Sequence, residues 1–294
     1  MSNTLAAFPE NNPNIHNSRF LKRYSGDYLN HHTSNVHKVF IESHRGVSKE
    51  EPENTILAFE KAILIGCDSI EMDIWLTKDK IPIVIHGDDD GCLHVDSKKS
   101  FINSLTLEEI SKVNLEKNQK IPSLYEVFKI CKYKIFLNLE LKDPNYEETF
   151  SIVTNLINYF DMKNEVQVSS FNHSYWNTIE KNGHSSYIEF GFLYDKINKK
   201  IDNFDSLKLG LNPYSSNSNY KSMLNLWYGD VNEEIVMFAH INKMAVLAYF
   251  GMDDEETPEI INDLIKFKID VICTNDPRNA IRIRDEYYLL NNII

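Results

Sequence analysis

Two stretches of the chain place acidic side chains at alternate positions between apolar ones. Residues 70–74 read Ile-Glu-Met-Asp-Ile, so that Glu71 and Asp73 alternate with apolar residues. Residues 137–142 read Leu-Asn-Leu-Glu-Leu-Lys and place Glu140 in the same way. Side chains of a strand alternate between its two faces, so Glu71 and Asp73 point to one side, roughly 7 Å apart. If the two stretches are neighbouring strands of a barrel, all three carboxylates reach one small volume inside it.

Three buried carboxylates are costly unless cations neutralise them. No Cys or His occupies the matching positions, and carboxylate oxygens are the ligands that hard cations prefer. We therefore predict one divalent cation, Mg²⁺ or Ca²⁺, held by Glu71, Asp73 and Glu140. The alternative is that Arg45 and Lys142 alone neutralise the carboxylates, which would leave an excess of negative charge.

Two histidines follow short apolar runs, His44 after residues 39–43 and His86 after residues 81–85. Each is expected at the end of a strand, where the carboxylates should also lie. Histidine has an unperturbed pKa of about 6.5 and can accept or donate a proton, each role being worth on the order of 10² to 10⁴ in rate. A single histidine at a strand end is more often structural, but two that converge on three carboxylates favour an acid–base pair.

Strands alternating with helices must position these residues. Strands are expected at residues 39–43, 69–76, 133–141, 166–170, 187–193, 207–211, 244–250 and 271–274, and helices at 53–65, 146–159, 233–241 and 258–267. Such alternation is typical of parallel strands with crossover helices. At this length it predicts an α/β fold, a TIM-type (β/α)8 barrel over residues 37–294, with its chemistry at the C-terminal ends of the strands.

Three segments depart from the alternation. Residues 1–36 are rich in Asn, His, Ser and Pro and are interpreted as an N-terminal extension that is partly disordered. Residues 87–120 are too long for a loop and contain a helix-capping pattern at Thr106. They are expected to form a small inserted subdomain after the second strand. Residues 212–229 are expected to form a long surface loop.

Bulk properties exclude several classes of protein. The net charge of -12 argues against a nucleic-acid partner. No apolar run is long enough for a transmembrane segment, and the first residues lack the apolar stretch of a secretory signal. The four cysteines are widely spaced and are expected to be reduced thiols. These features predict a cytoplasmic protein, of an oligomeric state that the sequence leaves open.

Several motifs occur in an order that resembles the glycerophosphodiester phosphodiesterase family. They are His44-Arg45-Gly46, Pro52-Glu53-Asn54-Thr55, Glu71-x-Asp73, His86, Asn138-x-Glu140-x-Lys142 and Thr274-Asn275-Asp276-Pro277. The resemblance implies hydrolysis of small glycerophosphodiesters, such as glycerophosphocholine, to glycerol 3-phosphate and an alcohol.

The resemblance also implies roles for individual residues. His44 and His86 would be the acid–base pair, and Glu71, Asp73 and Glu140 would hold the divalent ion. The residues expected to bind the substrate are Arg45, Lys142, Asn54 and Tyr249.

Two departures from the family pattern affect these expectations. The family places Asp directly after the second histidine, whereas Gly87 stands here and Asp88 follows. Asp88 either orients His86 or begins the insertion. Tyr249 occupies a position that is usually Trp, and it either forms an aromatic wall for the head group or only packs.

Three alternative functions would make different demands on the sequence. A phospholipase D-like enzyme acting on lysophospholipids or sphingomyelin would need an apolar surface, which exposure of Phe101 and Ile102 would indicate. A catalytically silent glycerophosphodiester-binding protein would typically lack a histidine or a metal carboxylate, and this chain has them all. A sugar-processing barrel explains neither the two histidines nor Lys142.

Overall fold

The computed structural model describes residues 38–95, 97–183, 188–196, 222–242 and 244–291. Within these residues, eight parallel strands lie in the order β1-β11-β10-β9-β8-β7-β6-β2, and pairing of β1 with β2 closes the barrel. The strands are β1 (Phe40–Ser43), β2 (Ser69–Leu76), β6 (Phe136–Leu141), β7 (Val166–Ser170), β8 (Glu189–Leu193), β9 (Ser222–Trp227), β10 (Ala245–Tyr249) and β11 (Val271–Thr274). The predicted TIM-type α/β barrel is confirmed.

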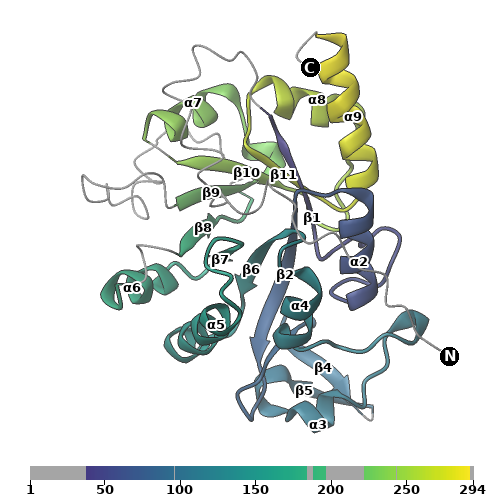
Figure 1. The fold of residues 1–294 in the computed structure, drawn as a ribbon, viewed down its shortest axis with the longest axis vertical. Helices are drawn as coiled ribbons and strands as arrows, with labels where there is room; N and C mark the ends of the chain where they lie inside the picture. The colour runs from purple at the N-terminus through teal and green to yellow at the C-terminus, as the bar shows by residue number, and fades with distance from the viewer. Residues whose placement is uncertain (1–37, 96, 184–187, 197–221, 243, 292–294) are drawn as a thin grey trace, which may run out of the picture.

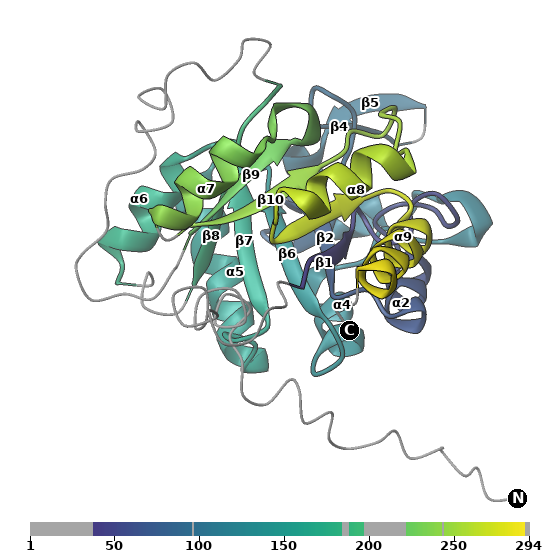
Figure 2. The ribbon, with the colours of Figure 1, turned by 90° about the horizontal axis from the view of Figure 1, so that it is seen from above.

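Helices surround the barrel, as Figures 1 and 2 show from two directions. They are α2 (Ile56–Ile65), α4 (Leu124–Cys131), α5 (Tyr146–Phe160), α6 (Ser174–Lys181), α7 (Glu233–Ile241), α8 (Pro258–Lys266) and α9 (Pro277–Leu290). The outward residues Ile70, Met72 and Ile74 of β2 belong to the large apolar cluster beneath these helices. The alternate positions of the strands face inward, and a smaller cluster that includes Phe40, Phe136 and other inward residues fills part of the interior.

The segment between residues 87 and 120 forms a separate group of elements on one side of the barrel (Figure 1). It contains the antiparallel hairpin of β4 (Cys92–Val95) and β5 (Lys98–Phe101), followed by the short helix α3 (Leu107–Ile110). The capping pattern at Thr106 forms as predicted, with its side chain accepting from the Glu109 backbone. A small apolar cluster of its own includes Ile102 and Ile110.

The chain reaches this segment through a short strand that is not among the eight strands expected for the barrel. β3 (Pro82–Val84) runs antiparallel to β2, with Ile74 paired to Val84. The chain therefore turns back after Leu76 and returns along the strand that carries Glu71 and Asp73. This return determines where His86 lies.

The predicted loop over residues 212–229 is wrong in part. Residues 222–227 form β9, where Met223, Leu224, Asn225 and Leu226 are buried on alternating faces. The Asn- and Ser-rich composition just before it obscured this short strand. The strand expected at 207–211 and the extension expected at 1–36 lie outside the described residues.

Two bulk expectations can be compared with the structure. The four cysteines are buried and form no disulfide. Among the described residues, no helix combines the length and the apolar character needed to cross a membrane.

Candidate active site

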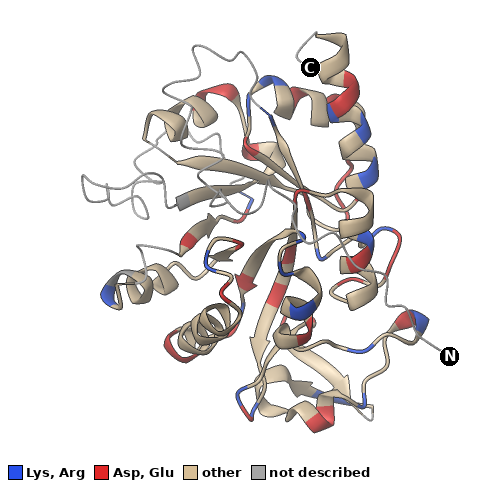
Figure 3. Cartoon of the chain, in the orientation of Figure 1, with Lys and Arg blue, Asp and Glu red and all other residues tan. Residues whose placement is uncertain are grey.

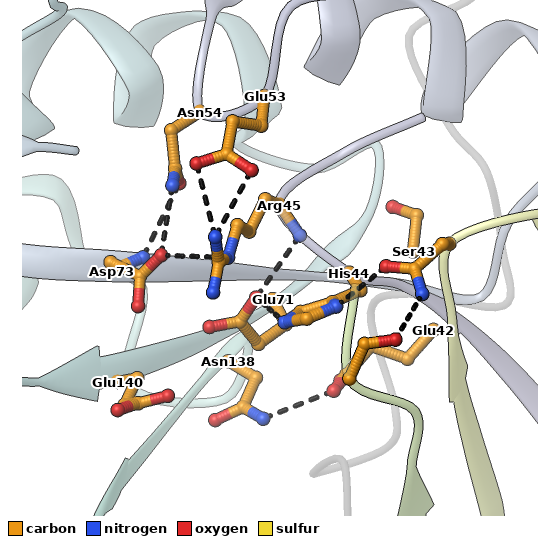
Figure 4. A network of polar contacts seen from close by, with 12 residues as sticks. Glu42, Ser43, His44, Arg45, Glu53, Asn54, Glu71, Asp73, Asn138 and Glu140 are labelled. Atoms are coloured by element: carbon orange, nitrogen blue, oxygen red, sulfur yellow. Dashed lines mark hydrogen bonds and ion pairs between the residues drawn. The ribbon is translucent and has the colours of Figure 1, made fainter. Parts of the chain in front are cut away.

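The pairing of β2 with β6 brings the three predicted carboxylates together. Asp73 lies opposite Glu140 and Glu71 opposite Asn138 in this register. Each of the three acids offers an oxygen within 4.8 Å of the others, and all three are buried. Figure 3 shows in red the acidic positions of the chain, some of them within the barrel strands, and Figure 4 shows the side chains of Glu71, Asp73 and Glu140 pointing toward one another.

The electrostatics of this group favour the binding of a further positive charge. Burial and the neighbouring Asp73 and Glu140 raise the pKa of Glu71 well above its ordinary value. Burial also raises the pKa of Glu140, although Lys142 opposes the shift. Burial acts on Asp73 in the same direction, but Lys142 and Arg45 outweigh it and lower its pKa.

Two carboxylate oxygens at this point have no hydrogen-bond partner. They are Oε1 of Glu71 and Oδ1 of Asp73, both buried. Converging carboxylate oxygens that lack hydrogen-bond partners, with no sulfur or imidazole in the set, match the ligands of a hard divalent cation. The residues present therefore fit the predicted Mg²⁺ or Ca²⁺.

Lys142 and Arg45 both line the pocket beside the carboxylates. Lys142 Nζ lies 2.9 Å from Glu140 Oε1 and 3.4 Å from Asp73 Oδ1. Arg45 Nη1 donates to both oxygens of Glu53 at 3.0 Å, and its Nε lies 3.2 Å from Asp73 Oδ2. Both cations are thus held at the edge of the acidic group, where an anionic ligand would meet them.

The imidazole of His44 is held by a residue that directly follows the last strand of the barrel. Its Nδ1 lies 2.8 Å from Asn275 Oδ1, while Asn275 Nδ2 donates to the Gly251 carbonyl at 3.0 Å. The amide therefore presents its oxygen to the imidazole, which places a hydrogen on Nδ1 and leaves Nε2 facing Glu71 at 3.9 Å. Burial and the positive charge of Arg45 lower the pKa of His44 to about 4.

His86 reaches the site from the opposite direction, along the return strand β3. Ile85 donates its backbone N–H to the Asp73 carbonyl, so His86 follows directly beside the carboxylates. Its Nδ1 lies 2.9 Å from the Gly87 carbonyl, which likewise assigns the hydrogen to Nδ1 and leaves Nε2 available. Asp88 instead accepts hydrogen bonds from the Cys92 backbone within the insertion and pairs with Lys99. These contacts favour the interpretation that Asp88 begins the insertion.

The turn after β1 explains why a glycine stands two residues after His44. Arg45 and Gly46 have φ values of 55° and 81°, and a Cβ added to Gly46 would lie 2.7 Å from the Ala58 Cβ. The tight turn sends the chain back so that Asn54 lies against Asp73. Asn54 Nδ2 donates to Asp73 Oδ2 at 2.8 Å, and its side chain is fully buried. Asn54 therefore supports a carboxylate from behind and is not among the residues that line the pocket.

A pocket of about 160 Å³ opens above the carboxylates. Both histidines line it, together with Tyr249 and Phe171. The Tyr249 hydroxyl donates to the Tyr194 carbonyl at 2.8 Å, and its ring meets Phe171 edge to face. This contact fixes an aromatic wall at the pocket.

Sequence reasoning did not assign a role to Asn275. The signal was available, because Asn275 belongs to a motif at the end of the expected last strand, and that strand must lie beside the first in a closed barrel. Glu256, which accepts from the Asn275 backbone and from the Thr274 hydroxyl, had no such signal.

Comparison with known proteins agrees with this geometry. The model of the "Glycerophosphoryl diester phosphodiesterase family" matches residues 44–279. A glycerophosphodiester phosphodiesterase of Caldanaerobacter subterraneus subsp. tengcongensis is 32% identical over 259 residues, which cover 84% of this chain and 98% of the relative.

Solved structures share the fold. A provisional glycerophosphodiester phosphodiesterase from Galdieria sulphuraria has a TM-score of 0.74 at 23% identity and covers 86% of this chain and 100% of its own. A phosphodiesterase of Oleispira antarctica in complex with the product sn-glycerol-3-phosphate has a TM-score of 0.66 at 22% identity and covers 84% of this chain and 96% of its own.

Proposed function

The chain belongs to the glycerophosphoryl diester phosphodiesterase family, and from this premise we propose that it hydrolyses small glycerophosphodiesters with the help of one divalent cation. The substrate would be a compound such as glycerophosphocholine, and the products glycerol 3-phosphate and the free alcohol. One observation carries the proposal: two imidazoles and three converging carboxylates line or border a single small pocket.

The cation would be held by Glu71, Asp73 and Glu140. The buried oxygens of Glu71 and Asp73 that lack a hydrogen-bond partner support this assignment, as do the raised pKa values of Glu71 and Glu140. When bound there, it would withdraw negative charge from a non-bridging phosphate oxygen. Lys142 and Arg45 would contact the other phosphate oxygens, since both already lie at the edge of the acidic group.

The two histidines would divide the proton transfers. His44 is neutral near pH 7 because its pKa is lowered to about 4, so its Nε2 can accept the proton of the nucleophile. The nucleophile is either water, which gives glycerol 3-phosphate directly, or the 2-hydroxyl of the glycerol, which gives a cyclic phosphate that a water molecule then opens to glycerol 3-phosphate. As the oxygen of the nucleophile bonds to phosphorus, the bond to the departing alcohol breaks, and His86 in its protonated form donates a proton from Nε2 to the oxygen of that alcohol.

The test measures release of glycerol 3-phosphate from glycerophosphocholine, with Mg²⁺ or Ca²⁺ and with chelator. Chelation is expected to abolish turnover, and His44→Ala and His86→Ala are each expected to lower kcat by about 10² to 10⁴. His94→Ala, at an exposed position on β4, is the matched control and should retain wild-type turnover. Turnover that is indifferent to chelator would refute the metal assignment, and wild-type activity in either histidine variant would remove that residue from the mechanism.

Phe101 gives a reason to test a second substrate. Its side chain is 60% exposed, whereas the neighbouring Ile102 is completely buried, so only one half of the expected apolar surface is present. Lysophosphatidylcholine should therefore be assayed beside glycerophosphocholine. A kcat/KM that favours the lysophospholipid would assign the enzyme to the phospholipase D-like class instead.

A further inference from the structure

Three polar side chains line the pocket beside the carboxylates, and each has at least one polar atom without a hydrogen-bond partner. Asn138 comes from β6, Ser169 from β7 and Asn225 from β9, and we refer to these three residues as the floor cluster. The unpaired atoms are Asn138 Oδ1, Ser169 Oγ and both polar atoms of the Asn225 amide. The residues are 2%, 0% and 0% exposed, so bulk solvent does not satisfy them.

A glycine in the intervening strand lets these side chains come close. Gly191 lies on β8, between the strands that carry Ser169 and Asn225. A Cβ added to Gly191 would lie 2.6 Å from Asn225 Nδ2, 2.7 Å from Gln167 Nε2 and 3.0 Å from Ser169 Cβ. Any other residue at this position would displace the polar groups from the floor of the pocket.

The orientation of Asn138 is determined by a neighbour that is not part of the floor cluster. Its Nδ2 donates to Glu42 Oε1 at 3.0 Å, and Figure 4 shows the carboxamide oxygen directed away from that contact. Asn138 therefore offers an acceptor to the pocket. Asn225 offers both a donor and an acceptor, and Ser169 can act as either.

The chemistry of the floor cluster selects among possible ligands. Buried polar groups are rarely left without partners, so either water or a ligand should satisfy them. An acyl chain has no hydrogen-bonding groups to offer, and a phosphate would find no positive charge in the floor cluster. Hydroxyl groups both donate and accept, and they match an uncharged set of amides and a hydroxyl. The pocket volume of about 160 Å³ far exceeds the ~10–15 Å³ that one water needs.

We propose that Asn138, Ser169 and Asn225 form a subsite that binds the free hydroxyl groups of the glycerol moiety and thereby selects glycerol that is not acylated. The proposal rests on the proposed function, because it places the phosphate between the histidines and the glycerol below it. It accounts for the four polar atoms of the floor cluster that have no hydrogen-bond partner among the described residues.

The test compares two ligands that differ only in these hydroxyls. Glycerol 3-phosphate and n-propyl phosphate carry the same phosphate, and their dissociation constants are measured by calorimetry in one buffer. The wild-type protein should prefer glycerol 3-phosphate by about 10-fold or more, as expected for hydrogen bonds to buried groups. Asn225→Leu should reduce this preference to about 1- to 3-fold while leaving the affinity for n-propyl phosphate unchanged.

Controls separate the subsite from general damage to the fold. Thr154→Val removes an equally buried, unpaired hydroxyl in α5, outside the pocket, and should keep the full preference. Ser169→Ala is the second floor variant if Asn225→Leu does not fold. Equal binding of the two phosphates by the wild type, or an unchanged preference in a folded floor variant, would show that the floor holds only water and would overturn the proposal.

Failure of the proposed subsite can be distinguished from failure of the proposed function. Turnover of glycerophosphocholine by the wild type is measured separately, and its absence would refute the proposed reaction. Loss of the ligand preference in the floor variants would still identify a hydroxyl subsite. Conversely, active enzyme without the preference would refute the subsite alone.

Discussion

Replacing Glu71 with Gln should have opposite effects on stability in the presence and absence of the divalent cation. Without a cation, Glu71 is buried beside Asp73 and Glu140, and these neighbours raise its pKa. Gln has nearly the same shape and can still accept the hydrogen bond that the Arg45 backbone gives to Glu71. Glu71→Gln should therefore stabilise the cation-free protein and weaken its response to the cation.

The magnitude follows from the geometry of the acidic group. The ligand oxygens lie within 4.8 Å of one another, and two unit charges at this separation repel by ~3.5 kcal/mol in an effective dielectric of ~20. Partial compensation by Arg45 leaves an expected gain of ~1–3 kcal/mol for the variant, or a rise in Tm of roughly 2–12 °C. A cation at 100 times its Kd stabilises the wild type by ~2.7 kcal/mol, which corresponds to roughly 5–11 °C.

The sign of the pH dependence can be worked out for the cation-free protein. The folded state keeps the Glu71 proton above the ordinary pKa of 4.5, at which the unfolded state releases it. The folded state therefore binds more protons, and its stability falls as the pH rises from about 4.5 through the raised pKa. Glu71→Gln should flatten this fall.

The assay is thermal unfolding at pH 5 and pH 8, with chelator and with Mg²⁺ or Ca²⁺. Glu42→Gln is the matched control, since Glu42 is an equally buried acid of the barrel interior that bonds Ser69 and Asn138 and lies outside the acidic triad. It should keep the full response to the cation. The reasoning is refuted if Glu71→Gln lowers the Tm in chelator and gains as much from the cation as the wild type.

Two further predictions concern positions around His44. Asn275→Leu removes the acceptor from His44 Nδ1 and should lower kcat by roughly 10-fold or more with little change in KM; a kcat equal to that of the wild type would contradict a positioning role. Gly46→Ala should destabilise the protein by ~2–4 kcal/mol, because the new Cβ would meet Ala58 and the φ is positive. Gly66 has the same positive φ but open space around it, so Gly66→Ala should lower the free energy of unfolding in urea by only ~1 kcal/mol. Equal losses of stability in the two variants would show that the contact with Ala58 has no effect.

Alternation along β2 and β6 was sufficient to predict which carboxylates meet. A barrel strand packs its apolar face against the surrounding helices. The acidic face, which carries Glu71 and Asp73 on β2 and Glu140 on β6, therefore has to point into the barrel interior. The register that sets Asp73 opposite Glu140 was not predicted, because a shift of two residues would leave the same side chains facing the interior.

Other parts of the site depend on contacts that a single sequence does not encode locally. The antiparallel return of β3 was missed because this strand has only three residues. So short a run shows no alternation of side chains from which a strand could be predicted. The placement of Asn54 behind Asp73 follows from the positive φ of Arg45 and Asn54, which are non-glycine residues and give no sequence signal for such a turn. β9 was missed because Asn225, at its centre, is typical of loops.

The contact between His44 and Asn275 joins residues that are 231 positions apart in the chain. Since β1 pairs with β11 as well as with β2, the first strand acquires its second neighbour only after nearly all of the polypeptide has been made. During synthesis, a nascent chain would thus carry the acidic cluster long before its imidazole base is fixed in one tautomer. Hydrolytic competence should therefore appear only once β11 pairs with β1 and closes the barrel.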